Sequence, residues 1–316
     1  THSLEAAYLV MYDRCQSKQD LDDIYINHKL MPAKRKARNS LLKEAPSYEI
    51  KARNSLLKKA PSYEIKAKLI NYYQSGQYEE AETLAISMTQ EFPKYQFGWK
   101  VLGALFGQIG RQSDALEANQ IAIRLSPEDA DVHNNLGITL KNLGRLEEAK
   151  ASYRQVIVLN SGHAEAHNNL GNILRKLGRL EEAESSLRQA LALTPDYAEA
   201  HNNLGNALQE LDRLEEAEAS YRKAIVLKPD YSEAHSNLGN LLYHLGKLEE
   251  AEASCRKAIV LKPDYSEAHN NLGNALQELD RLEEAEACYR KAIVLKPDLA
   301  EAHYNLGHTL EIVGRL

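Results

Sequence analysis

The dipeptide Leu-Gly recurs every 34 residues through most of this 316-residue chain. Its positions are Leu102-Gly103, Leu136-Gly137, Leu170-Gly171, Leu204-Gly205, Leu238-Gly239, Leu272-Gly273 and Leu306-Gly307. A fixed period of this length is typical of a repeat array, in which each unit buries its apolar face against its neighbours. The period therefore predicts an array of like units and not a globular domain with a single centre.

Each unit carries small and large apolar residues at helical spacing. In residues 198–231 these positions are Leu204, Gly205, Leu208, Ala217, Tyr221 and Ala224. They fall on two successive helices, and Pro229 closes the unit. The pattern resembles the tetratricopeptide repeat. Residues 96–129 match it at Trp99, Leu102, Gly103, Phe106, Ala115 and Pro127. The resemblance implies an all-α fold, a right-handed superhelical solenoid of antiparallel helix pairs.

Counting from these anchors predicts two regions. Residues 62–316 form the repeat array, with seven units and, from Ala300 onward, the first helix of an eighth. Within a unit, Asp230 and Glu233 predict a capping box at the start of the first helix. Residues 1–61 form an N-terminal extension, expected to be helical. It contains a direct duplication, because residues 36–50 reappear as residues 51–65 with one change.

The duplicated segment is strongly basic. Residues 31–68 hold eleven Lys and Arg against three Glu, a balance of +8 in a chain of net charge −6. Such a segment can contact an acidic partner, but it lacks an aromatic stacking pattern or a recognition motif, so a nucleic-acid partner is not expected. The alternative is a solvated cap or linker.

Composition narrows the class of protein further. The chain is 43% hydrophobic and 27% charged, and no apolar run reaches membrane-spanning length, so no membrane partner is expected. The three cysteines, Cys15, Cys255 and Cys288, lack metal or redox spacing and favour a reducing compartment, the cytoplasm. Cys255 occupies the position of Tyr221 and is expected to be a small core residue. Because the chain opens without methionine, an upstream segment could have been removed.

Asparagine recurs in two rows on the first helix of the units. The pre-glycine row, directly before Leu-Gly, comprises Asn135, Asn169, Asn203, Asn237, Asn271 and Asn305. The post-glycine row, directly after it, comprises Asn172, Asn206, Asn240 and Asn274. An amide both donates and accepts hydrogen bonds, so such rows can hold an extended peptide backbone. They resemble the asparagine ladder of O-linked N-acetylglucosamine transferases, which implies a concave peptide-binding groove. Alternatively, duplication copied them, or some of them bond the backbones of neighbouring helices.

Two further polar sets are candidate binding residues. Lys141, Arg175 and Lys176 form a basic cluster that could dock an acidic peptide end, or else a solvated helix end. Histidine recurs once per unit, as at His201 and His235. One histidine per helix supplies no second ligand, so partial burial is expected and a metal site is not.

No catalytic constellation or phosphate loop is present in the sequence, so the chain is predicted to be neither an enzyme nor a cofactor binder. The leading function is a scaffold that binds an extended peptide or partner protein. One alternative is the substrate-binding arm of a larger, glycosyltransferase-like enzyme, with continuation expected past Leu316. Another is a self-assembling array, stacked end to end through an apolar stripe formed by Ala302, Leu306, Leu310 and Val313.

Overall fold

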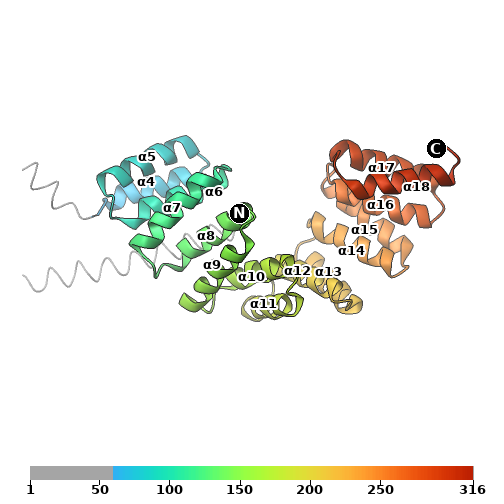
Figure 1. Cartoon of the computed structure of the whole chain (residues 1–316), viewed down its shortest axis with the longest axis horizontal. Coiled ribbons are helices and arrows are strands. Elements are labelled where there is room, and N and C mark those ends of the chain that lie inside the picture. Colours follow the sequence, from blue (N-terminus) through green and yellow to red (C-terminus); the bar gives the residue numbers. More distant parts are fainter. Residues whose placement is uncertain (1–59, 316) are drawn as a thin grey trace, which may run out of the picture. The chain divides into compact units, whose positions relative to one another are not determined.

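The computed structural model describes residues 60–315, which form fifteen α-helices and no strand (Figure 1). The chain is therefore an all-α helical repeat solenoid, as the period predicts. The predicted helical extension lies outside the described residues. Contacts divide the chain after Pro127 into two compact units, which are described separately.

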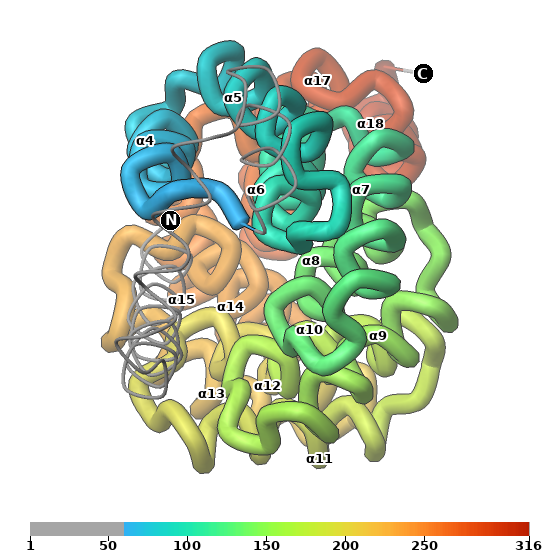
Figure 2. The backbone as a smooth tube through the Cα atoms, turned by 90° about the vertical axis from the view of Figure 1, so that its left-hand side faces the viewer, coloured from blue at the N-terminus to red at the C-terminus, as the bar shows by residue number. Residues whose placement is uncertain are grey.

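The helices follow one another in pairs joined by short turns. The first compact unit contains α4 (Tyr63–Gln74), α5 (Tyr78–Glu91), α6 (Gln96–Gln108) and α7 (Gln112–Leu125). The second contains α8 (Ala130–Asn142), α9 (Leu146–Leu159), α10 (Ala164–Lys176), α11 (Leu180–Leu193), α12 (Ala198–Glu210), α13 (Leu214–Leu227), α14 (Ser232–His244), α15 (Leu248–Leu261), α16 (Ser266–Glu278), α17 (Leu282–Leu295) and α18 (Ala300–Ile312). In Figure 2 the tube shows this succession of hairpins. Even-numbered helices are the first helices of their pairs.

The first helices α6, α8, α10, α12, α14 and α16 each pass close to their second helix at the glycine of Leu-Gly. A Cβ atom on Gly205 would lie 2.6 Å from Cε1 of Tyr221, well inside van der Waals contact. The residue of the second helix that meets this glycine is called here the facing position. In the second compact unit it is occupied by Tyr153, Leu187, Tyr221, Cys255 and Tyr289. All five are buried, so the 34-residue period marks the places where helices approach closely.

The turn inside a pair requires a left-handed backbone, and two residue types supply it. Gly178 and Gly246 have φ values of 72° and 71°, and Asp212 and Asp280 have values of 59° and 58°. Glycine adopts this conformation without steric cost, and Asp is among the few other residues that tolerate it. Gly and Asp therefore alternate along the four turns from α10 to α17.

The predicted capping box is wrong. The N-cap of α14 is Tyr231, one residue after Asp230, and its side chain makes no capping hydrogen bond. The helix starts one residue later than the sequence pattern suggests, which removes Asp230 from the position where a carboxylate accepts from the first turn.

Adjacent pairs are also tied together by ion pairs on their second helices. Glu218 of α13 accepts from Lys247 at 2.8 Å, across the junction with the next pair, and from Arg222 of its own helix at 2.8 Å. Glu252 repeats this arrangement with Arg256 and Arg281, also at 2.8 Å. Hydrogen bonds from Lys247 and Arg222 lower the pKa of Glu218 against the opposing effect of its partial burial. The carboxylates are thus held in their charged form.

The prediction that Cys255 is a small core residue is confirmed, because its side chain is fully buried beside Tyr289. Burial raises the pKa of the Cys255 thiol to about 12 and that of Cys288 to about 11. Since the thiolate is the reactive form, burial lowers the reactivity of both thiols in mildly alkaline buffer.

We therefore expect Cys255 and Cys288 of a Cys15→Ser variant to resist alkylation by iodoacetamide in the folded chain. Both should react at the rate of a free thiol once denaturant unfolds α15 and α17. Mass spectrometry of time-resolved digests measures each site. Rapid labelling of Cys255 without denaturant would contradict its place in the core.

Candidate peptide-binding surface

The pre-glycine asparagines connect neighbouring first helices. Nδ2 of Asn203 donates to Oδ1 of Asn168 on the preceding first helix at 2.9 Å, and Asn168 is fully buried. The corresponding bonds in the later pairs are Asn237 to Asn202 at 3.0 Å, Asn271 to Oγ of Ser236 at 3.2 Å and Asn305 to Asn270 at 3.2 Å. At these four positions an amide donor is used inside the chain. Asn169 is buried and Asn135 is half-buried.

Two asparagines of the post-glycine row have a fully occupied side-chain oxygen. Oδ1 of Asn206 accepts from the hydroxyl of Tyr221 at 2.7 Å and from Nδ2 of Asn237 at 3.2 Å. Oδ1 of Asn274 accepts in the same way from Tyr289 at 2.9 Å and from Asn305 at 2.9 Å. An amide oxygen has two lone pairs, so neither oxygen has capacity for a further donor. Their Nδ2 groups remain available as donors.

The other two members of the row, Asn172 and Asn240, have side-chain oxygens that accept no hydrogen bond in the described part of the chain. Their Oδ1 atoms are buried and have no hydrogen-bond partner among residues 60–315. The facing positions of these pairs hold Leu187 and Cys255 in place of tyrosine, so no hydroxyl reaches the amide. A buried polar atom without a partner is uncommon in proteins and requires an explanation.

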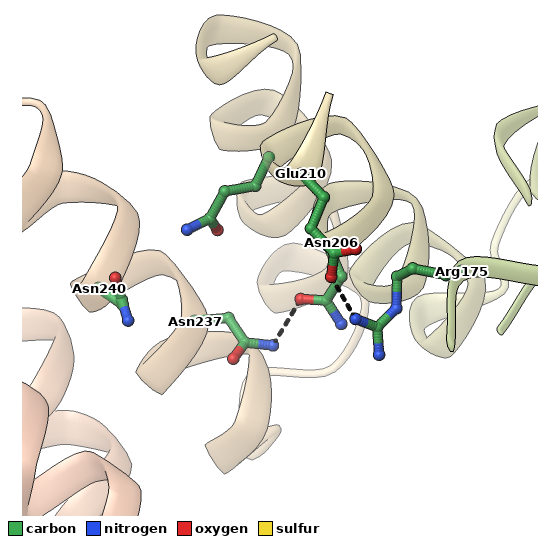
Figure 3. Close-up of a pocket in the computed structure, with 6 residues that line it drawn as sticks. Arg175, Asn206, Glu210, Asn237 and Asn240 are labelled. Atoms are coloured by element: carbon green, nitrogen blue, oxygen red, sulfur yellow. Dashed lines mark hydrogen bonds and ion pairs between the residues drawn. The ribbon is translucent and has the colours of Figure 1, made fainter. Parts of the chain in front are cut away.

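A polar pocket of about 330 Å³ opens on the first helices α10, α12 and α14. Its lining consists of Arg175, Asn206, Gln209, Glu210, Asn237 and Asn240. Figure 3 shows the hydrogen bond between Asn206 of α12 and Asn237 of α14, with Asn240 also on α14. Two successive members of the post-glycine row thus lie in the same pocket. The side-chain oxygen of Asn206 already accepts two hydrogen bonds, and that of Asn240 accepts none from the described residues.

Arg175 supplies the positive charge of this pocket. Its guanidinium forms an ion pair with Glu210 of the next first helix, and its Nε is buried without a partner. The basic cluster predicted from sequence is divided by the structure. Lys176 is exposed and Lys141 is half-buried on α8, and neither lines the pocket. An acidic group that enters the pocket would meet Arg175 and would compete with Glu210 for it.

The recurring histidines close the loops between pairs. Nε2 of His201 lies 2.9 Å from the carbonyl oxygen of Pro195, and Nε2 of His235 lies 3.1 Å from that of Pro229. Both rings are half-buried, as expected from sequence. Burial lowers the pKa of His235, which favours the neutral ring. Across residues 60–315, no group of His, Cys, Asp or Glu is arranged to hold a metal ion.

Other features of the described chain bear on its partners. Between residues 60 and 315, no helix combines the length and apolar character needed to cross a bilayer. On α18, Ala302 is buried, whereas Leu306, Leu310 and Val313 are half-buried. End-to-end association through this stripe stays a prediction.

Sequence reasoning placed Gln209 and Glu210 on the groove face but missed the role of Asn168. Gln209 and Glu210 line the pocket one turn beyond the post-glycine row, and Asn168 is the buried acceptor for Asn203. A signal for the pocket was nevertheless present. The facing position alternates between tyrosine and a residue without a hydroxyl along the last four complete pairs, which gives a period twice that of Leu-Gly.

The paired helices and their close glycine contacts define a tetratricopeptide-repeat protein. Profiles of the tetratricopeptide repeat match residues 266–299 and residues 239–280. The profile of the family described as "Cilia and flagella-associated protein 70 C-terminal domain" matches residues 28–239, about two thirds of the chain. The chain belongs to this family. Among curated proteins, the comparison finds no match.

Solved structures share the fold. A chain of the APC/C hetero-tetramer Cut9–Hcn1 is similar with a TM-score of 0.69 at 17% identity, over 77% of this chain and 48% of that one. A tetratricopeptide repeat protein of Parabacteroides merdae gives 0.63 at 18% identity, over 78% and 98% of the two chains. PilF of Pseudomonas aeruginosa gives 0.59 at 20%, over 67% and 97%. The protein thus spans about half of the Cut9–Hcn1 chain.

Proposed function

We propose that this protein is an interaction scaffold that binds an extended peptide segment of a partner along its first helices. The pocket on α10, α12 and α14 carries the proposal, because all six of its lining side chains are polar and three of them are asparagines. Its volume lies within the range of small-ligand sites. A surface of this kind suits a chain of peptide groups better than an apolar ligand.

Amide chemistry supports recognition of the backbone. A peptide group offers one donor and one acceptor, and an asparagine side chain offers the complementary pair. Asn206 supplies a donor, and Asn240 supplies an oxygen that no group of residues 60–315 uses. Because backbone groups are common to all sequences, such contacts hold an extended segment with little dependence on its side chains.

Arg175 adds a preference for acidic residues. Its guanidinium already binds a carboxylate, that of Glu210, and a ligand carboxylate can take the same place. The scaffold is thus expected to favour extended segments that carry an Asp, a Glu or a free C-terminus beside the asparagines. Membership in a family named for cilia and flagella makes components of those organelles the first partners to test.

The test uses a short linear peptide selected from a random-sequence library by binding to the 316-residue chain. Replacing Asn206 and Asn240 together by Ala should weaken its binding roughly five- to a hundredfold, since each lost hydrogen bond is worth about 0.5–1.5 kcal/mol. Fluorescence anisotropy measures the affinity, and circular dichroism checks that the helices persist.

Gln189→Ala is the matched control, because this exposed amide lies on a second helix, α11, away from the pocket. It should leave affinity unchanged. A library that yields no binding peptide, or an affinity that Asn206→Ala and Asn240→Ala leave intact, would refute the proposed function.

A further inference from the structure

The groove asparagines repeat with a period of two units, or 68 residues, and not one. Asn206 and Asn274 have saturated oxygens, whereas Asn172 and Asn240 have oxygens with no partner. The same alternation extends to the pre-glycine row. Asn237 and Asn305 each donate to the post-glycine asparagine of the preceding pair. Asn203 and Asn271 make only the bond that all four share, to Asn168 and to Ser236, which are equivalent to Asn202 and Asn270.

The alternation originates in the core. Tyr221 and Tyr289 occur in pairs whose first helix has a small residue after the asparagine, Ala207 and Ala275. Where that residue is large, as at Ile173 and Leu241, the facing position holds Leu187 or Cys255. All of these side chains are buried. A small residue on the first helix is therefore combined with a tyrosine on the second, and a large residue with a side chain that has no hydroxyl. As a result, a hydroxyl that can bind the groove amide is present in only every second pair.

The presence or absence of the tyrosine hydroxyl decides which asparagine side-chain oxygens can accept a hydrogen bond from a ligand. The terminal torsion of asparagine is soft, so the amide can turn to bring its oxygen toward the groove. For Asn206 that rotation breaks the bonds from Tyr221 and Asn237. For Asn240 it breaks none, and a ligand donor relieves an oxygen that is otherwise buried without a partner.

We infer that a bound peptide donates its backbone N–H groups to Asn172 and Asn240 only, whereas Asn206 and Asn274 act as donors to its carbonyl groups. The contacts to the peptide N–H groups therefore recur in every second helix pair. The buried residue at the facing position decides which pairs these are. This inference rests on the proposed function, since it assigns roles to individual amides of the same surface.

A scan of N-methylated peptides tests the assignment. Each backbone N–H of the selected peptide is methylated in turn, and its affinity is measured for the chain, for Asn172→Ala with Asn240→Ala, and for Asn206→Ala with Asn274→Ala. For the unmodified chain, methylation at the contacting positions should weaken binding roughly two- to tenfold. That penalty should vanish in the first variant and persist in the second. Comparing the same peptides across variants cancels the steric effect of the methyl group.

Three results would overturn the inference. The loss of affinity on N-methylation could vanish in the variant with Asn206→Ala and Asn274→Ala. It could change equally in both double variants. Alternatively, methylation could leave the affinity unchanged at every position of the peptide. In each case the unmodified peptide still binds the chain, so failure of the inference is distinct from failure of the proposed function, in which no peptide binds.

Exchange of the facing position provides the reciprocal test. Tyr221→Phe removes one hydroxyl and frees a lone pair on Asn206, so one additional methyl-sensitive position should appear in the peptide. Leu241→Ala with Cys255→Tyr gives the pair α14–α15 the Ala and Tyr of α12–α13, so the position that depends on Asn240 should lose its sensitivity. If Tyr221→Phe adds no position and the double substitution removes none, the core does not set the register.

Discussion

Replacing Gly205 by alanine is expected to lower the free energy of unfolding by about 1–3 kcal/mol. The new Cβ would lie 2.6 Å from Cε1 and 2.7 Å from Cδ1 of Tyr221, whose ring is 1% exposed and cannot move aside freely. Overpacking should exceed the gain of about 1 kcal/mol that alanine offers over glycine within a helix. Urea denaturation followed by circular dichroism measures the change.

Gly307→Ala is the matched control for this prediction. Gly307 occupies the same position of Leu-Gly on α18, and no atom lies within 4 Å of a Cβ built there. Only the helix propensity changes, so stability should rise by about 0.5–1 kcal/mol. Equal shifts for the two variants would show that the close approach at Gly205 does not limit the packing of the pair.

Asn206→Ala and Asn240→Ala should affect stability in opposite ways although they occupy equivalent positions. Asn206→Ala removes the acceptor of the Tyr221 hydroxyl and of the Asn237 amide, and we expect a loss of about 1–3 kcal/mol. Asn240→Ala removes an oxygen that no group in the described part of the chain uses and introduces a better helix former, so stability should be unchanged or higher.

The same denaturation experiment compares the two variants. Gln209 moderates the loss in Asn206→Ala, because its Oε1 lies 3.0 Å from the Tyr221 hydroxyl and can accept its single proton once Asn206 is gone. If Asn240→Ala proved as destabilising as Asn206→Ala, Asn240 would be an ordinary structural residue. A stable Asn240→Ala chain with weakened peptide binding would instead identify a side chain kept for its ligand at no benefit to the fold.

The sequence predicted the fold because the fold depends on short-range rules that repeat. Leu204 and Gly205 recur in phase, and the glycine is needed wherever a second helix presents a large side chain. The burial of Cys255 followed from its equivalence to Tyr221. The start of α14 was misplaced by one residue, because Asp230 and Tyr231 are both compatible with the local pattern and only the packed helix decides between them.

The use of each asparagine could not be predicted in the same way. Asn203 and Asn237 occupy equivalent positions, yet the first donates to Asn168 and the second to both Asn202 and Asn206. Which acceptor an amide finds depends on distances between helices that are 34 residues apart in sequence. These distances depend on the size of the core side chains. They cannot be predicted from the periodic pattern of polar residues.

The division of the chain into two compact units has a practical consequence for spectroscopy. Trp99 is the only tryptophan and lies on α6, in the unit that ends at Pro127. Its emission therefore reports on that unit alone, whereas most of the helical residues between 60 and 315, and hence most of their far-ultraviolet ellipticity, belong to α8 to α18. The two signals give independent views of one chain, so the cooperativity between its parts can be measured without dividing the protein or attaching a label.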